Sequence, residues 1–177
     1  MKYNAAQLLV EHAGATRDYD IDDPARVLDE GVEAVARLVG HVKLSRTNRG
    51  IVADAHIATE IRQECSRCLE LVLSPVETHI VEEFYPTVDL RTGQPLGRPE
   101  GGTGFMMTEA HEVDLAEPFR QAVLLELPMK PLCQPNCAGL CPHCGTNLNE
   151  RRCSCVEESI DPRLAALADW LKADRLH

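Results

Sequence analysis

Two long runs of alternating apolar and polar residues, separated by a short turn, constrain the fold of this chain more than any other feature. Apolar side chains occupy every second position from residue 32 to residue 44, and the same period resumes from residue 51. The intervening Asn48-Arg49-Gly50 is typical of a tight turn. Because a period of two places alternate side chains on one face of a strand, the pattern predicts an antiparallel hairpin with one buried face.

Further elements follow the hairpin. A β run over 69–73 is expected to stop at Pro75 and to be followed by a separate strand over 76–85. Residues 86–108 contain five glycines and three prolines without periodicity, which predicts a mobile loop. A helix is predicted from Asp114, with Glu117 at the capping-box position. Its expected apolar stripe consists of Leu115, Phe119, Ala122, Val123 and Leu127.

Eight cysteines follow a spacing that indicates metal ligation. Two, Cys65 and Cys68, form a C-x-x-C pair in the first half of the chain, and the other six lie within the 24 residues from Leu132 to Cys155. In the segment CPHCG, Gly145 can take the positive φ that turns backbone N–H groups toward the preceding sulfurs, as in zinc knuckles. The sequence has neither a signal-peptide pattern nor an apolar run of membrane length, so we expect a cytoplasmic protein. Disulfides are rare in that compartment, which favours thiolate-bound zinc.

The eight cysteines divide evenly into two four-thiolate sites. The division we favour places Cys65, Cys68, Cys133 and Cys137 in one site and Cys141, Cys144, Cys153 and Cys155 in the other. The first would join the end of the sheet to the segment after the helix, and the second would close a local loop. The alternative is one site, formed by Cys133 or Cys137 with Cys141, Cys144 and one of the last two cysteines. His143 is expected to point outward.

The combined pattern predicts an α+β fold. It consists of an antiparallel sheet built on the hairpin, which could close into a barrel, a packing helix, a C-terminal zinc-binding cysteine module and a terminal helix. Asp161-Pro162 marks the start of that last helix, whose stripe is Leu164, Leu167 and Leu171. The expected division is an N-terminal segment (1–30), a sheet and helix domain (31–129) with the mobile loop 86–108, and the cysteine module with its helix (130–177).

Charge and motifs limit the functions to consider. The net charge of −10 argues against a protein that binds nucleic acid over its whole surface. A local basic set remains, and we consider it a candidate surface for RNA or for a partner: Arg37, Lys43, Arg46, Arg49, Arg62 and Arg67, with Arg151 and Arg152 nearby. No nucleophile triad, phosphate loop or paired-carboxylate motif is present. A four-thiolate zinc has no open position for water, so we expect a protein without enzymatic activity.

Four segments together resemble the bacterial YceD family of large ribosomal RNA subunit accumulation proteins. They are ECSRCLE (64–70), ELPMKPLC (126–133), CAGLCPHCGTNLNERRCSC (137–155) and DPRLAAL (161–167), and the resemblance extends over roughly residues 30–171. It implies a factor of the bacterial cytoplasm that is needed for accumulation of 23S rRNA, and so for assembly of the large ribosomal subunit.

Two other classes of function fit the same cysteines. A zinc thiol-switch chaperone would release its metal on oxidation, and a zinc ribbon would bind nucleic acid directly. Residues 130–177 carry six basic and six acidic side chains, which disfavours the ribbon. For the leading interpretation the expected partner is pre-ribosomal RNA, a ribosomal protein or an rRNA-processing protein. Neither a membrane nor a small-molecule substrate is expected.

Overall fold

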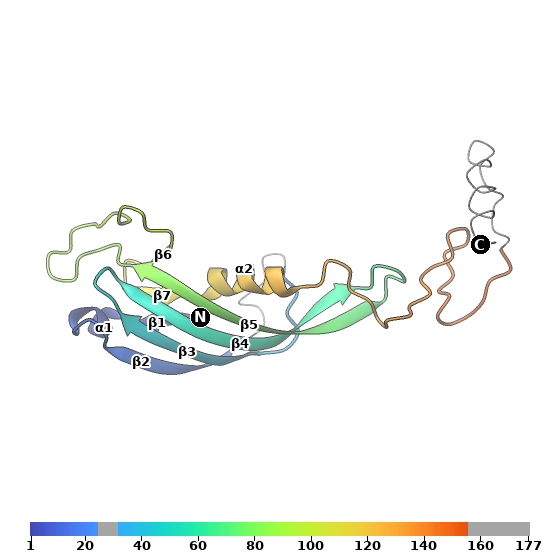
Figure 1. The fold of residues 1–177 in the computed structure, drawn as a ribbon, viewed down its shortest axis with the longest axis horizontal. Coiled ribbons are helices and arrows are strands. Elements are labelled where there is room, and N and C mark those ends of the chain that lie inside the picture. The colour runs from blue at the N-terminus through green and yellow to red at the C-terminus, as the bar shows by residue number, and fades with distance from the viewer. Residues whose placement is uncertain (25–31, 156–177) are drawn as a thin grey trace, which may run out of the picture.

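The structure is a computed structural model of the chain, and it describes residues 1–24 and 32–155. In those residues strands predominate and two helices are present (Figure 1). The elements in chain order are β1 (Lys2–Asn4), α1 (Ala6–Val10), β2 (Thr16–Asp23), β3 (Leu38–Arg46), β4 (Ile51–Glu64), β5 (Leu71–Tyr85), β6 (Phe105–Met106), β7 (Glu112–Asp114) and α2 (Ala116–Glu126).

The main sheet is open and has the strand order β2-β3-β4-β5-β6. Its neighbours are antiparallel except for β5 and β6, which run parallel over two residues. In the described part of the chain the sheet does not close into a barrel. β1 and β7 form a separate antiparallel pair, which brings the N-terminus beside the start of α2. The α+β class is confirmed, and the sheet is mixed rather than purely antiparallel.

The predicted hairpin is formed by β3 and β4. Its turn is closed by the Thr47 N–H, which donates to the Gly50 carbonyl at 2.9 Å. β3 begins at Leu38, later than the alternation that starts at residue 32. Residues 33–35 still bond to β4, because Val35 N–H donates to the Glu60 carbonyl and Arg62 N–H donates to that of Glu33. The pattern therefore identified the buried face, and the bend before Leu38 shortened the regular strand.

Pro75 does not interrupt the strand that contains it, which corrects the prediction. β5 is continuous from Leu71 to Tyr85, and Pro75 lies opposite Glu60 of β4. β6 pairs only with the last two residues of β5, Phe84 and Tyr85. Most of β5 is therefore a sheet edge among the described residues. A proline can be accommodated at such an edge because its missing N–H has no ladder partner to satisfy there.

The core lies between one face of the sheet and α2, which runs along that face in Figure 1. Three residues of the predicted stripe, Leu115, Phe119 and Val123, have no exposed surface. The other two, Ala122 and Leu127, are half-buried against the same core. The helix begins at Ala116, not at Asp114, whose carboxylate accepts a hydrogen bond from the Ala116 N–H at 3.0 Å. Glu117 does not complete a capping box with Asp114, and instead bonds to Arg120 at 2.7 Å. Asp114 belongs to β7.

The segment between β5 and α2 is partly ordered by its own hydrogen bonds. Asp89 accepts bonds from the N–H groups of Arg91 and Thr92 at 2.9 and 2.8 Å, and β6 and β7 follow at residues 105–114. The mobility predicted for 86–108 and the proposed domain boundaries stay predictions. The predicted helix at 161–171, with Trp170, lies outside the described residues.

β4 and β5 extend beyond the other strands and form an arm (Figure 1). The segment after α2 runs back along this arm, so the cysteine-rich residues lie at its far end. Among the residues described, no helix has the length and apolar content that crossing a membrane requires.

Candidate metal centres

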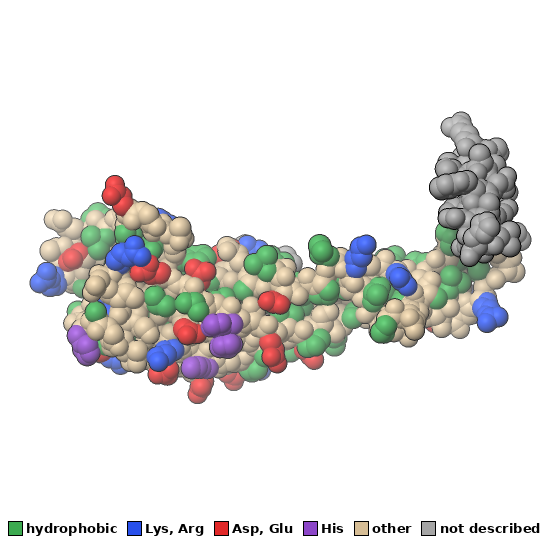
Figure 2. Space-filling model, viewed as in Figure 1, with side chains coloured by type: hydrophobic (Ala, Val, Ile, Leu, Met, Phe, Trp, Pro, Cys, Tyr) green, Lys and Arg blue, Asp and Glu red, His purple; other side chains and the backbone are tan. Residues whose placement is uncertain are grey.

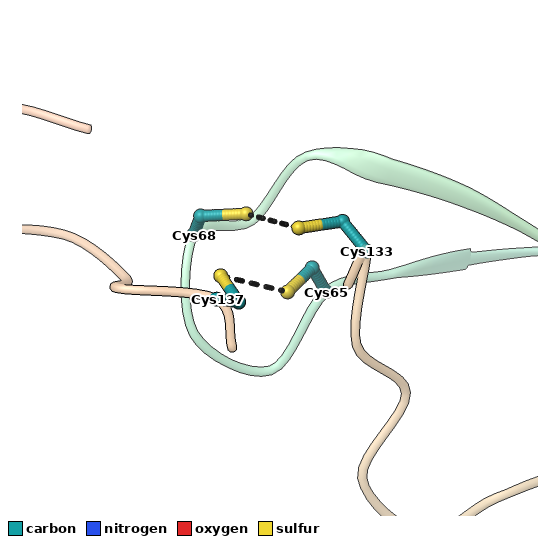
Figure 3. A group of neighbouring side chains, drawn as sticks. All are labelled: Cys65, Cys68, Cys133 and Cys137. Atoms are coloured by element: carbon teal, nitrogen blue, oxygen red, sulfur yellow. Dashed lines mark hydrogen bonds between the residues drawn. The ribbon is translucent and has the colours of Figure 1, made fainter. Parts of the chain in front are cut away.

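Four cysteines from two distant parts of the chain meet at the tip of the β4–β5 arm (Figure 3). Cys65 and Cys68 lie in the turn between the strands, and Cys133 and Cys137 lie in the segment after α2. The sulfurs of Cys65 and Cys137 are 3.8 Å apart, and those of Cys68 and Cys133 are 3.5 Å apart. All four sulfurs lie within 4.8 Å of one another. We call this group the first tetrad.

The turn that carries Cys65 and Cys68 is shaped so that both thiols face inward. Leu69 has a φ of 61°, and its N–H donates to the Cys65 carbonyl at 3.0 Å. The Ser66 N–H donates to the Pro131 carbonyl at 2.8 Å, which fixes the second segment against the turn. Cys65, Cys68 and Cys137 are buried, whereas Cys133 is exposed. The first tetrad therefore links positions 65 residues apart in sequence.

The other four cysteines form a second tetrad, whose ligand atoms also lie within 4.8 Å of one another. Its members are Cys141, Cys144, Cys153 and Cys155. Gly145 has a φ of 69°, and its N–H donates to the Cys141 carbonyl at 2.9 Å, which is the expected knuckle turn. Cys141 is buried, and Cys144 and Cys155 are exposed. The two groups have the membership of the division favoured from the spacing, while binding of a metal by them stays a prediction.

The donor sets fit a tetrahedral thiolate metal. Zinc–sulfur bonds of about 2.3 Å in a tetrahedron place the sulfurs about 3.8 Å apart. The Cys65–Cys137 and Cys68–Cys133 sulfur separations in the first tetrad, 3.8 and 3.5 Å, are close to that value. All eight cysteines are free thiols. Either tetrad could therefore hold a metal ion after small movements of its sulfurs.

Ionisation of the thiols is uneven within each tetrad. Burial opposes ionisation of Cys65, but hydrogen bonds from the backbone of Arg67 and Cys68 lower its pKa to about 6. The neighbouring Cys68 raises the pKa of Cys133 to about 12. In the second tetrad a hydrogen bond from Thr146 lowers the pKa of Cys144 to about 6. Crowded thiols resist joint ionisation, and a bound dication would remove that resistance.

Asn149 is a hydrogen-bond partner of the first tetrad that the cysteine spacing does not indicate. It belongs to the loop of the second tetrad, yet its side-chain amide donates to Cys137 Sγ at 3.2 Å. Its Oδ1 atom accepts bonds from the Ala138 N–H at 2.7 Å and from the Gln134 amide at 3.0 Å. These bonds orient Cys137 and connect the two tetrads. The sequence carries no signal for this role, because a hydrogen bond to a ligand requires no fixed spacing.

Two arginines of the predicted basic set, Arg46 and Arg67, stabilise the fold through hydrogen bonds to backbone carbonyls. The Arg46 guanidinium donates to the carbonyls of Leu9 and Gly50 at 3.1 and 3.0 Å and also to that of Thr47. The Arg67 guanidinium donates to the Cys137 carbonyl at 2.8 Å, so it stabilises the first tetrad.

The other members of the basic set do not form one patch. Arg37 and Arg49 flank opposite ends of β3, which spans about 30 Å at roughly 3.3 Å per residue. Arg37 bonds to Asp22 at 2.5 Å, Arg49 to Glu83 at 2.9 Å and Arg62 to Glu33 at 2.7 Å. Lys43 is exposed and lies between Asp18 and Asp54 in the strand register. Binding of RNA or of a partner by these residues stays a prediction.

Comparison with known proteins gives a consistent family. The model of the family described as large ribosomal RNA subunit accumulation protein YceD matches residues 53–171. An uncharacterized protein of Mycobacterium tuberculosis is 34% identical over 157 residues, which cover 85% of this chain and 71% of the relative. No solved structure was found to match the chain.

A plant relative carries the family name. The chloroplastic large ribosomal RNA subunit accumulation protein YCED homolog 1 of Arabidopsis thaliana is 40% identical over 53 residues, which cover 30% of this chain and 16% of the relative. The family model, by contrast, extends from β4 through both tetrads and matches more than half of the chain. The chain therefore belongs to the YceD family of large ribosomal RNA subunit accumulation proteins.

Proposed function

We propose that this protein is a non-enzymatic factor of large-subunit ribosome biogenesis in the bacterial cytoplasm, where it supports accumulation of 23S rRNA. The observation that carries the proposal is the family match over residues 53–171. The arrangement of the chain is compatible with a scaffold: a sheet covered by α2 and a long arm whose tip is held by cysteines.

We further propose that each tetrad holds one structural zinc ion. Four thiolates fill all positions of a tetrahedral zinc, so such an ion would stabilise the fold and would not activate water. The first zinc would tie the tip of the arm to the segment after α2. The second would hold residues 141–155, where Cys141 is the only buried residue in the structure as described.

A protein is the favoured direct partner. Arg37, Arg49 and Arg62 already pair with acids of this chain, which reduces what they can offer to phosphates. The arm also presents Leu69, Leu71 and Leu73 with 59%, 65% and 54% of their surfaces exposed. Exposed apolar side chains gathered in one place are typical of protein-binding surfaces. A ribosomal or rRNA-processing protein fits this surface better than bare RNA.

Depletion of the protein from its host tests the proposal. We expect less 23S rRNA and fewer large subunits on sucrose gradients, and both should be restored by the wild-type gene. A Leu71→Ser/Leu73→Ser variant should fail to restore them while folding normally, and Leu90→Ser is its control on an exposed site away from the arm. Normal large-subunit levels after depletion would contradict the proposed function.

RNA is the other possible partner, and a binding assay separates the two. Replacement of Arg37, Lys43 and Arg49 by alanine should leave any binding to 23S precursor RNA unchanged if a protein is the direct partner; Arg46 is kept because it bonds to three backbone carbonyls. A loss of affinity in this variant, together with a shallower dependence of affinity on salt concentration, would instead support contact with RNA phosphates.

The exposure of Cys144 and Cys155 favours a second candidate function, a zinc thiol switch. Mild peroxide would then release zinc from the second tetrad and increase the ability to prevent aggregation of unfolded proteins. Zinc that stays bound under those conditions excludes the switch.

A further inference from the structure

Three of the seven histidines of the chain lie in one row across the exposed face of the sheet. His41 of β3 is opposite His56 of β4, and His56 is opposite His79 of β5. This face is opposite to the one that packs against α2, and all three side chains are exposed. Figure 2 shows histidine side chains gathered near acidic ones on the surface of the molecule. The row arises from the strand register, and nothing in the sequence spacing indicates it.

The pair on β4 and β5 is close enough to share one ion. The rings of His56 and His79 stack with their centroids 4.0 Å apart and an angle of 7° between their planes. Asp54 lies beside them, and its Oδ1 atom is 2.8 Å from His79 Nε2. One ligand atom from each of the three residues lies within 4.8 Å of the others.

Small rotations would complete a coordination site. Metal–nitrogen bonds of about 2.0–2.1 Å in a tetrahedron require donor atoms about 3.3 Å apart. Exposed side chains change rotamer within nanoseconds, so the two rings can turn from the stacked arrangement toward one ion. A third donor is then available from the Asp54 carboxylate, whose bond to His79 would be replaced by the bond to the metal.

The surroundings favour a cation. Asp20 continues the histidine row on β2, and Asp18 lies 3.9 Å from His41 Nε2. Glu77 follows on the exposed face of β5. Lys43 lies between Asp18 and Asp54, and its positive charge offsets part of the negative charge around the histidines. Asp22 contributes little to that negative charge because it is paired with Arg37. Among the described residues around the histidines, the carboxylates of Asp18, Asp20, Asp54 and Glu77 outnumber the single ammonium group of Lys43. The local electrostatic potential is therefore negative.

We propose that Asp54, His56 and His79 form a surface site for a divalent transition-metal ion of the kind that prefers imidazole, such as Zn²⁺, Co²⁺ or Ni²⁺. Its chemistry differs from that of the thiolate tetrads. Three protein ligands leave at least one position for water or for a donor from another molecule. A shallow pocket of about 220 Å³ beside His56, lined in part by Val39, Ala58 and Glu77, provides room for that ligand.

Cobalt titration tests this site in the untagged, full-length protein, after zinc loading and dialysis that leaves zinc only in the tetrads. We expect one additional equivalent of Co²⁺ to bind with only weak visible absorption, since no thiolate is involved. Its paramagnetism should broaden the amide resonances of residues 54–56 and 79 before others. The His56→Ala/His79→Ala variant should bind at least about tenfold more weakly, because even loss of an outer partner of a metal ligand costs that much. His12→Ala, a change of another exposed histidine, should bind as wild type does.

Three results would overturn the proposal. The first is equal cobalt affinity of the wild type and the double variant. The second is broadening that centres away from β4 and β5. The third is uptake that occurs only with intense thiolate-to-cobalt absorption, which would mean that cobalt enters the tetrads alone. The replaced histidines are exposed, so both variants should fold as wild type does. An unchanged thermal unfolding temperature, measured before cobalt is added, verifies this.

Discussion

Replacement of Asn149 by alanine tests how the two tetrads depend on each other. The change removes the amide that donates to Cys137 Sγ at 3.2 Å and the oxygen that accepts the Ala138 N–H at 2.7 Å. Burial opposes ionisation of Cys137, but its pKa is lowered overall, and the hydrogen bond from Asn149 is the largest of the effects that lower it. Without Asn149 the pKa of Cys137 should therefore rise, and the thiolate that binds the metal should form less readily.

The magnitude follows from the bonds that are lost. A hydrogen bond to a charged group contributes about 1.5–3 kcal/mol. Loss of an outer partner of a metal ligand weakens metal binding by about 10–100-fold, and tenfold corresponds to about 1.4 kcal/mol. Both routes predict that zinc binds the first tetrad about 10–100-fold more weakly in Asn149→Ala.

Competition with a coloured chelator measures this directly. Zinc-loaded protein should release its ions in two phases, which Cys65→Ser and Cys141→Ser assign to the first and the second tetrad. In Asn149→Ala only the phase of the first tetrad should move to lower chelator concentration. Asn48→Ala, in the exposed hairpin turn, is the matched control and should leave both phases unchanged. An unchanged first phase in Asn149→Ala would refute the reasoning.

Three further predictions concern the fold. Phe119→Ala removes a fully buried side chain of α2 and should lower the free energy of unfolding in urea by about 3–5 kcal/mol; Leu125→Ala, at an 86% exposed position of the same helix, should change it by less than about 0.5 kcal/mol. Gly40→Ala would put a Cβ atom 1.9 Å from the His56 carbonyl oxygen, so it should force β3 from β4 and cost at least about 1–3 kcal/mol in the same assay, whereas Gly97→Ala, with open space around it, should be neutral. A hydrogen bond from Arg120 lowers the pKa of Glu117 to about 2 from an ordinary 4.5, so this pair stabilises the fold above about pH 4.5 and its contribution is lost as the pH falls toward 2; the stability difference between wild type and Glu117→Gln should shrink over that window, and a constant difference would contradict the assignment.

The parts of the fold that depend on local pattern could be predicted from the sequence. Alternation identified the buried faces of β3 and β4, because a period of two leaves one arrangement that buries the apolar set. The stripe of α2 could be identified because its apolar residues recur at the helical period of 3.6. Cysteine spacing indicated which thiols could meet, because a C-x-x-C pair offers two ligands from one turn.

The parts of the fold that depend on contacts between residues distant in sequence could not be predicted. β1 pairs with β7 over three residues each, and such short segments carry no periodicity to recognise. Continuation of β5 through Pro75 depends on β5 being a sheet edge at that point, which is a property of the topology. The role of Asn149 and the histidine row likewise arise from register and loop packing. The sequence suggested that the basic set forms one exposed surface. Its ion pairs with acidic residues distant in sequence could not be predicted.

We propose that two zinc ions, each bound by four cysteines, hold the arm and the module after α2. Zinc analysis combined with X-ray absorption at the zinc edge tests it most directly, on protein dialysed to remove weakly held metal. We predict two zinc ions per chain, with four sulfur neighbours each at about 2.3 Å. One zinc per chain would contradict the two-site arrangement. No zinc, or a shell of nitrogen and oxygen neighbours, would contradict the claim itself.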